Sequence, residues 1–305
     1  MQIKGHECRP RMTAWRAGLL ACGFGWATWL APAAQAAPSM SNASSTVPQA
    51  LRQWSTAQGF CDWVSRRLPN LPHAVCTEAD LAQTPGRSVQ GRPLLRRDVV
   101  SPQARLKVLV LGGMHGDELS STSLVLHWIA TAREIPSNVH WRFVPLINPD
   151  GMLLDKPRRT NANGVDLNRN FPTPNWDKEA SFYWNQRTRK DPRRYPGPKP
   201  LSEPESRWVH SEMDQWKPDL IVSVHAPYGV LDFDGPTVPP QRLGRLYLDQ
   251  VGIFPGSLGN YGGVHRKVPV VTIELPSALR TPQDAEIRQM WLDLIRWTAE
   301  RLGAD

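Results

Sequence analysis

Four short polar clusters each lie at the edge of an apolar stretch of the chain, at residues 115–118, 166–171, 223–226 and 272–276. They supply imidazole and carboxylate groups, which bind zinc, and a guanidinium, whose planar fork suits a substrate carboxylate. Polar side chains at the ends of β-rich runs are typical of the active site of an α/β enzyme. The clusters therefore predict one site that is assembled from distant segments.

His115 and Glu118 are the first candidate ligands, three residues apart and just after the apolar run 106–111. On the first turn of a helix this spacing would point both side chains the same way, so that they could share one cation. The spacing also arises by chance, and a helix start would explain Asp117 and Glu118 equally well. The pair alone does not establish a metal site.

His225 offers a third ligand because it ends another apolar strand, at the same edge of the expected sheet. A single histidine there is more often a core residue, but two histidines and a glutamate with an open fourth position are typical of catalytic zinc.

Glu274 lies near the end of an interior strand, where a carboxylate needs a partner or a function. Facing a zinc-activated water, Glu274 would be the general base of a hydrolase.

As a set, these residues resemble the M14 zinc carboxypeptidase family over most of the chain, from about residue 91 onward. Segments 148–151, 161–172 and 202–205 are similar to the murein peptide amidase A branch of that family. The resemblance implies the following roles: zinc ligands His115, Glu118 and His225; catalytic carboxylate Glu274; carbonyl-polarising Arg159; substrate-carboxylate binding by Asn168 and Arg169; and Asp166 orienting the first zinc histidine. One zinc ion per chain is expected.

The chain also departs from the digestive carboxypeptidases, which carry a mobile tyrosine shortly before a Gly-Ser turn. Residues 251–254 contain no tyrosine before Gly256 and Ser257, and we expect Tyr261 to line the pocket instead. The amidase branch includes cytoplasmic enzymes, whereas the N-terminus of this chain is typical of an exported protein.

The N-terminal 36 residues have the pattern of a signal peptide, with a basic start, an apolar run at 17–30 and the small-x-small site Ala34-Gln35-Ala36. An uncleaved membrane anchor is the alternative. Cleavage would leave 269 residues, enough for one α/β domain, and would lower the net charge from +8 to +5. The basic residues form no stripe with aromatic residues, so we expect no nucleic-acid partner. Since cleavage would remove the apolar run at 17–30, we also expect no stable membrane insertion of the mature chain.

The expected domains are a signal peptide at 1–36, a disordered leader at 37–48 and one zinc peptidase or amidase domain at 49–305. Two cysteines remain after cleavage, Cys61 and Cys76, and their spacing does not suit a zinc site. In an oxidising compartment such as the periplasm they could form a disulfide, with two free thiols as the alternative.

The apolar patterns predict a single-domain α/β fold with a mixed, mostly parallel sheet flanked by helices. The expected strands are 106–111, 139–147, 220–224 and 268–275, after a first strand pair entered near residue 91, and the expected helices are 51–68, 118–133, 202–216, 240–251 and 282–302. A Ser-x-x-Glu capping box at Ser202 and Glu205 would open the third helix. The interval 148–200 has little periodicity, which indicates a functional segment.

These observations and the resemblance together predict an exported zinc amidase that hydrolyses the γ-D-glutamyl to meso-diaminopimelate bond of murein-derived peptides. A carboxypeptidase that trims C-terminal residues is the first alternative. A zinc-containing peptide-binding module without catalysis is the second, and Glu274 argues against it because a module that had lost catalysis would be expected to lose the base first.

Overall fold

A computed structural model of the chain describes residues 54–68 and 70–303. The expected signal peptide at 1–36, the leader at 37–48 and the expected domain start at residue 49 lie outside the described residues. Among the helices of the described part, none combines the length and the apolar character that a membrane crossing requires.

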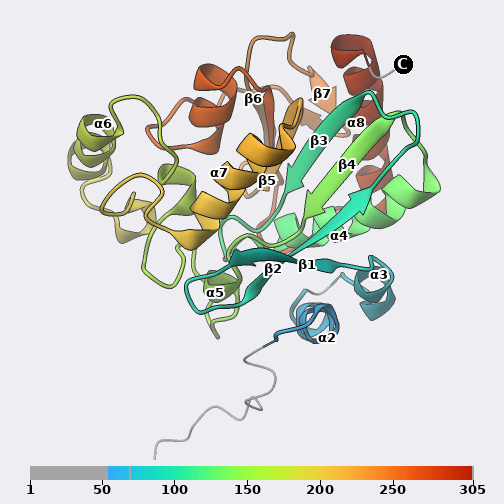
Figure 1. Cartoon of the computed structure of the whole chain (residues 1–305), viewed down its shortest axis with the longest axis horizontal. Coiled ribbons are helices and arrows are strands. Elements are labelled where there is room, and N and C mark those ends of the chain that lie inside the picture. Colours follow the sequence, from blue (N-terminus) through green and yellow to red (C-terminus); the bar gives the residue numbers. More distant parts are fainter. Residues whose placement is uncertain (1–53, 69, 304–305) are drawn as a thin grey trace, which may run out of the picture. The chain divides into compact units, whose positions relative to one another are not determined.

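A seven-stranded mixed sheet forms the centre of the fold, in the order β1-β2-β4-β3-β5-β9-β6 (Figure 1). Its strands are β1 (Ala82–Arg87), β2 (Pro93–Val99), β3 (Leu106–Leu111), β4 (Val139–Val144), β5 (Leu220–His225), β6 (Val230–Asp234) and β9 (Val270–Glu274). The four inner strands from β4 to β9 run parallel, and β1, β2 and β6 add antiparallel pairs at the two sides. The predicted α/β fold with a mixed sheet is confirmed.

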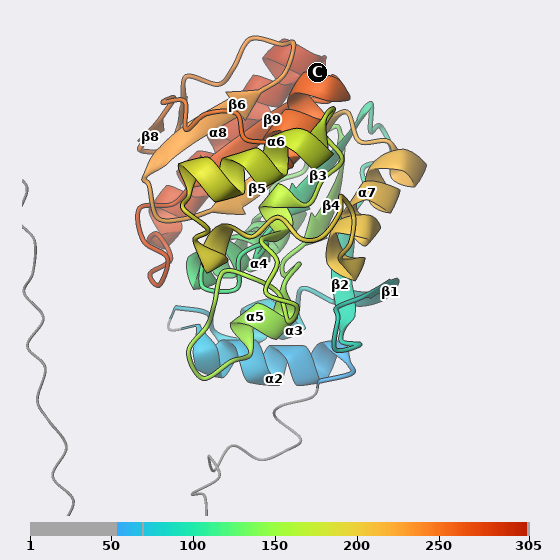
Figure 2. The ribbon, with the colours of Figure 1, turned by 90° about the vertical axis from the view of Figure 1, so that its left-hand side faces the viewer.

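Helices cover both faces of this sheet. They are α2 (Ala57–Arg67), α3 (His73–Thr77), α4 (Leu119–Glu134), α5 (Pro149–Met152), α6 (Trp176–Phe182), α7 (Pro204–Trp216) and α8 (Asp284–Leu302). Short 3₁₀ or π-helical segments are η1 (Leu167–Arg169), η2 (Tyr183–Arg187), η3 (Pro192–Arg194) and η4 (Gly259–His265). In the second view α7 lies on one side of the strands and α8 on the other (Figure 2).

Strand β3 shows why the sequences of the central strands are unbroken apolar runs. Val108 and Val110 pack into the core beneath α4 and α8, whereas Leu109 and Leu111 pack into the second core beneath α7. All four side chains are at most 1% exposed. Because successive strand residues point to opposite faces, a strand covered on both sides needs apolar residues at every position.

Three local predictions are wrong. Residues 240–251 form no helix but two short antiparallel strands, β7 (Arg242–Leu243) and β8 (Leu246–Tyr247), because Gly244 between them has a φ of +58° that a helix cannot accommodate. Helix α7 begins after Glu203 without a side-chain cap, and Glu205 accepts a hydrogen bond from the backbone of Val89 instead of completing a capping box at Ser202.

The third correction concerns the first metal-ligand pair. His115 and Glu118 do not lie on a helical turn, because α4 begins only at Leu119 and Glu118 has the non-helical dihedrals φ −98° and ψ 65°. The two side chains nevertheless converge, from the loop that joins β3 to α4.

A disulfide joins Cys61 of α2 to Cys76 of α3, the two cysteines expected to pair, with their Cα atoms 5.4 Å apart. Both residues are buried in the core that also contains α4 and α8. The bond ties the N-terminal helices of the described chain to each other.

Candidate metal centre and active site

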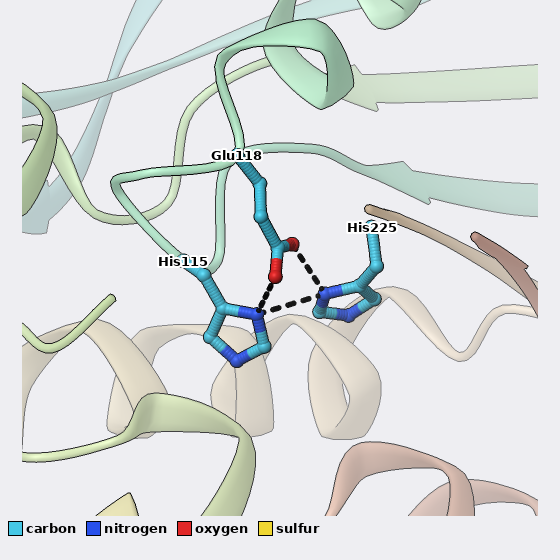
Figure 3. Close-up of side chains that lie close together, drawn as sticks. All are labelled: His115, Glu118 and His225. Carbon is cyan, nitrogen blue, oxygen red and sulfur yellow. Dashed lines mark hydrogen bonds and ion pairs between the residues drawn. The ribbon is translucent and has the colours of Figure 1, made fainter. Parts of the chain in front are cut away.

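His115, Glu118 and His225 come together at the carboxyl edge of the parallel strands (Figure 3). His115 and Glu118 come from the loop after β3, and His225 is the last residue of the neighbouring strand β5. Since β3 and β5 run parallel, their carboxyl ends meet at the same edge of the sheet. The sheet topology therefore brings together side chains that are 110 residues apart.

The donor atoms of the three residues point at one another. Glu118 Oε1 lies 2.7 Å from His115 Nδ1, and Glu118 Oε2 lies 3.0 Å from His225 Nδ1. The two Nδ1 atoms are 3.1 Å apart. All three residues are at least 95% buried, so this convergence is built into the interior and is not a chance contact of surface side chains.

This donor set fits a tetrahedral metal ion. Zinc with bonds of ~2.1 Å to nitrogen and oxygen would place its ligand atoms roughly 3.4 Å from one another, close to the separations found here. Two imidazole nitrogens and one carboxylate also match the usual ligands of catalytic zinc, which leaves a fourth position for water or substrate. The three residues could thus hold a zinc ion with little movement.

Each imidazole is oriented through its other nitrogen. Nε2 of His115 lies 3.2 Å from Asp166 Oδ1, and Nε2 of His225 lies 3.0 Å from the hydroxyl of Ser223. Partners of this kind fix the ring orientation of metal-binding histidines.

Burial alone would raise the pKa of the Glu118 carboxyl, but the two adjacent imidazoles hold this pKa well below its usual range, so Glu118 is ionised and available to a cation.

Arg159 lies against the same group. Its Nε donates to Asp166 Oδ2 at 2.9 Å, and one terminal nitrogen is 3.6 Å from Glu118 Oε1. The adjacent Arg158 turns away and donates to the carbonyl of Asn161. Of the two neighbouring arginines, Arg159 is the one that faces the candidate centre, and its charge is available to a developing oxyanion.

Glu274 shares the pocket and is placed by strand register. It ends β9 and lies directly opposite His225 of β5 in the parallel pairing. Its Oε2 is buried and has no hydrogen-bond partner among the described residues. Burial, together with the negative charge of Glu118, raises the pKa of Glu274 to about 7, which suits a group that must accept a proton near neutral pH.

Asn168 and Arg169 form another wall of the pocket. The Asn168 side-chain oxygen accepts a hydrogen bond from the Leu258 amide at 2.8 Å, which leaves its NH₂ group to donate elsewhere. The Arg169 guanidinium stacks over the Phe254 ring at 4.5 Å, and burial lowers its pKa to about 10, so it remains charged at neutral pH. The NH₂ group of Asn168 and the guanidinium of Arg169 can together donate hydrogen bonds to a substrate carboxylate.

One pocket of about 620 Å³ thus connects the predicted residues. Its lining includes His115, Glu118, Arg159, Asn168, Arg169 and Glu274. His225 and Asp166 are buried immediately behind that surface. The structure therefore brings together the eight residues predicted as metal ligands, catalytic groups, substrate-binding groups and the orienting carboxylate. The Cys61–Cys76 disulfide lies in the core elsewhere.

Tyr261 does not line the pocket, contrary to expectation. It is 5% exposed and stacks between Phe171 and His210 in the core beneath α7, with its hydroxyl 2.7 Å from Arg266. Tyr183 and Tyr228 line the pocket instead.

The sequence analysis did not predict Asp232 and Asp234 on β6, whose carboxylates line the pocket. Their signal was present in the sequence, because Leu231-Asp232-Phe233-Asp234 alternates apolar and acidic residues and so places both carboxylates on one face of a strand. Although β6 is an edge strand, both acidic residues on this face are buried, so they need the same explanation as Glu274.

The fold and the site are those of a zinc carboxypeptidase, and residues 80–231 match the model of that family, peptidase M14. The chain belongs to this family. Among curated relatives, murein peptide amidase A of Vibrio campbellii is 34% identical over 63% of this chain and 77% of its own length. Murein peptide amidase A of Escherichia coli K12 is 32% identical over 70% of this chain and 88% of its own length.

Solved structures show the same fold. Bovine thrombin-activatable fibrinolysis inhibitor, solved in complex with tick carboxypeptidase inhibitor, aligns with a TM-score of 0.56 and 18% identity over 82% of this chain and 96% of that one. The protein is thus a zinc-dependent metallohydrolase by family, with a His-Glu-His group that could bind the metal.

Proposed function

We propose that this protein is an exported zinc amidase that hydrolyses the bond between the γ-carboxyl of D-glutamate and meso-diaminopimelate in murein-derived peptides. The observation that supports it most is the presence, in one pocket, of a metal-binding triad, a carboxylate with a raised pKa and a buried arginine with an asparagine donor. The two amidase relatives supply the substrate class, because their similarity extends over most of their length.

The chemistry follows from the positions of the side chains. His115, Glu118 and His225 would hold one zinc ion, which supplies a Lewis acid that polarises the amide carbonyl and acidifies water. Glu274 accepts a proton as the water oxygen adds to the carbonyl carbon, and then donates it to the leaving amine as the C–N bond breaks. Arg159 stabilises the negative charge on the former carbonyl oxygen.

Substrate orientation is assigned to Asn168 and Arg169. Their donors would bind the free α-carboxylate next to the scissile nitrogen, so that the amide bond lies next to Glu274 and the His115–Glu118–His225 group. Asp166 contributes indirectly, since it orients both His115 and Arg159 through its two oxygens. Its role is positioning.

Export is supported by the N-terminal pattern at residues 1–36 and by the buried disulfide, a bond that is stable in the periplasm and rare in the cytosol. Fractionation of cells that produce the full chain would test it. We expect the protein in the periplasmic fraction with a mature N-terminus near residue 37. Recovery only from the cytosol, with an intact N-terminus, would contradict export.

The substrate assignment is tested with two peptides that differ in one linkage. L-Ala-γ-D-Glu-meso-diaminopimelate should be cut, whereas the peptide joined through the α-carboxyl of L-Glu should be poor, because the pocket must place a longer and differently branched acyl group. Equal kcat/KM values for the two would favour a carboxypeptidase. Human carboxypeptidase N catalytic chain is 33% identical over 41% of this chain and 34% of its own length.

A further inference from the structure

Arg159 lies in a part of the chain without regular secondary structure. Residues 153–166, all of which the structure describes, run from α5 to η1 as neither helix nor strand. The ligand loop, residues 112–118, which joins β3 to α4 and carries His115 and Glu118, is also irregular (Figure 3). Because no helix or strand pairing links the two segments, the position of Arg159 beside Glu118 depends on individual hydrogen bonds.

Asn148 connects the two segments. Its Nδ2 donates to the Arg159 carbonyl at 3.0 Å, and its backbone amide donates to the carbonyl of Gly113 in the ligand loop at 2.8 Å. The Arg159 carbonyl also accepts a hydrogen bond from the Gly116 amide at 3.4 Å. Asn148 is 0% exposed, so these bonds are made in the interior, where leaving a polar group without a partner is costly.

Glycines let the backbones approach closely around the Asn148 side chain. A β-carbon on Gly116 would lie 2.4 Å from the backbone carbonyl carbon of Gly151, and one on Gly151 would lie 2.7 Å from Asn148 Nδ2. The amide of Arg158 donates to the Gly151 carbonyl at 3.1 Å. The turn α5, the ligand loop and the backbone at Arg158 are therefore packed against one another, with Asn148 Nδ2 at their junction.

A helix cap explains only half of the Asn148 side chain. Its Oδ1 accepts a hydrogen bond from the Gly151 amide at 2.9 Å, which is the usual role of asparagine at the start of a helix. Serine or aspartate would cap α5 equally well. The bond from Nδ2 to Arg159 is not part of the cap, and it requires a donor, which an ionised aspartate lacks, and a reach, which serine lacks.

We propose that Asn148 is a positioning residue for Arg159, because it fixes the backbone from which the guanidinium reaches the carbonyl oxygen of the substrate. This inference deepens the proposed function and rests on its assignment of Arg159 to the negative charge on that oxygen. A charge stabilises a transition state only while it is held at the right distance, and a displacement of ~1 Å can lower the rate about 100-fold. Asn148 does not line the pocket, so it acts through Arg159.

The test is a double-variant cycle with the zinc-loaded protein, in which Asn148→Ser retains a cap and removes the donor. Asn148→Ser alone should lower kcat by about 10- to 100-fold and change KM less than about twofold, because Arg159 acts mainly on the transition state. In an Arg159→Ala background the same substitution should change kcat less than about threefold. Near-normal kcat in Asn148→Ser, or an undiminished loss in the Arg159→Ala background, would overturn the proposal.

Asn148→Ala separates the cap from the donor. It removes both, so it should unfold at a lower denaturant concentration than Asn148→Ser, whereas the two variants should lose kcat by the same factor. If the loss of kcat followed the unfolding midpoint instead, Asn148 would act as a cap alone and the positioning role would be wrong.

Thr84→Val is the matched control. The Thr84 hydroxyl also accepts from a backbone amide, that of Gly86 at 3.0 Å, and donates to a backbone carbonyl, that of Leu94 at 2.9 Å. Thr84 is 3% exposed and lies outside the pocket lining. This variant should be less stable than wild type and keep kcat within about twofold. A loss of kcat as large as that of Asn148→Ser would show that the effect is not specific to Arg159.

A spectroscopic measurement follows Arg159 without a substrate. Its Nε–H donates to Asp166 Oδ2 at 2.9 Å and its side chain is 13% exposed, so the proton should exchange slowly with water and give a ¹H–¹⁵N signal that is lost in Arg159→Ala. Asn148→Ser should speed this exchange at least about tenfold, and Thr84→Val should leave it unchanged. Unchanged exchange in Asn148→Ser would show that Arg159 keeps its position without the Asn148 donor.

Two substrates separate this inference from the proposed function, L-Ala-γ-D-Glu-meso-diaminopimelate and an α-linked N-acylated dipeptide. If only the α-linked peptide is cut, and the Asn148 effect depends on Arg159, the amidase assignment fails and the positioning role stands. If the γ-linked peptide is cut but the Asn148 effect is the same with and without Arg159, the amidase assignment stands and the positioning role fails. If neither peptide is cut, the exchange of the Arg159 Nε–H proton decides.

Discussion

His225 and Glu274 lie directly opposite each other on the parallel strands β5 and β9. This register places a candidate metal ligand next to the candidate base, although 49 residues separate them in the sequence. Because side chains alternate between faces, a shift of one residue in the pairing would turn Glu274 into the core beneath α4 and α8. The register of one strand pair thus determines whether the base reaches the site.

The first prediction concerns the metal. His225→Ala removes one of three converging ligands, so zinc content should fall from about one ion per chain to a small fraction while the far-UV circular dichroism stays unchanged. Metal analysis after dialysis measures it. His265→Ala, which changes an exposed histidine outside the pocket lining, is the control and should bind zinc normally. Full occupancy in His225→Ala would exclude His225 from the ligand set.

The second prediction separates metal binding from chemistry. Glu274→Gln keeps the size of the side chain but cannot accept a proton, so kcat should fall at least ~100-fold with zinc still bound. Turnover and metal content should be measured on the same sample. Loss of zinc together with activity would instead assign Glu274 to the metal.

The third prediction concerns Arg169. Amidation of the substrate α-carboxylate should lower kcat/KM by about 30- to 1,000-fold, because a charge-assisted contact in a buried pocket is lost. Arg169→Gln should lower it similarly on the free carboxylate, and the two changes together should cost little more than either alone. Additive losses would show that Arg169 and the carboxylate act independently.

The fourth prediction is a pH dependence of stability. Burial raises the pKa of Glu205 from 4.5 to about 7, so the folded protein retains a proton that the unfolded chain loses above pH 4.5. The contribution of Glu205 to the free energy of unfolding is therefore fully present below pH 4.5 and is lost as the pH rises through 7. Between pH 5 and 8 the free energy of unfolding should therefore fall by up to about 3 kcal/mol more in wild type than in Glu205→Gln. Parallel pH profiles from urea titrations would contradict it.

The fifth prediction concerns the disulfide between α2 and α3. Replacing Cys61 and Cys76 by serine opens a loop with a sequence separation of 15, which should lower the free energy of unfolding by roughly 3 kcal/mol. Denaturant titration of the double variant measures it, and activity at low temperature should persist because neither residue lines the pocket. Two alkylatable thiols in the non-reduced wild-type protein would show that the bond does not form.

Most of the strands and several of the site residues could be predicted from residue type and local periodicity. The strand β3 was predicted with its observed bounds. The metal ligands were predicted from their types and their positions at the ends of apolar runs, and Glu274 from the cost of burying a carboxylate. The remaining site residues were predicted from the family resemblance. Residues 240–251 were misassigned because the apolar spacing resembles a helix, and the left-handed conformation of Gly244 is a backbone property that spacing does not reveal.

The position of Asp232 and Asp234 in the pocket could not be inferred in the same way. The alternation at residues 231–234 indicates that both lie on one face of a strand, but only the pairing of β6 with β9 shows that this face carries Glu274. Strand order and register depend on contacts between distant segments, which one sequence does not specify.

The central claim is tested most directly by hydrolysis of L-Ala-γ-D-Glu-meso-diaminopimelate in ¹⁸O-water, followed by mass spectrometry. The account predicts two products, L-Ala-D-Glu with one ¹⁸O atom in its γ-carboxyl group and unlabelled meso-diaminopimelate, and their absence with Glu274→Gln. Intact tripeptide after prolonged incubation with zinc-loaded protein, or label in the carboxyl group of alanine, would contradict it.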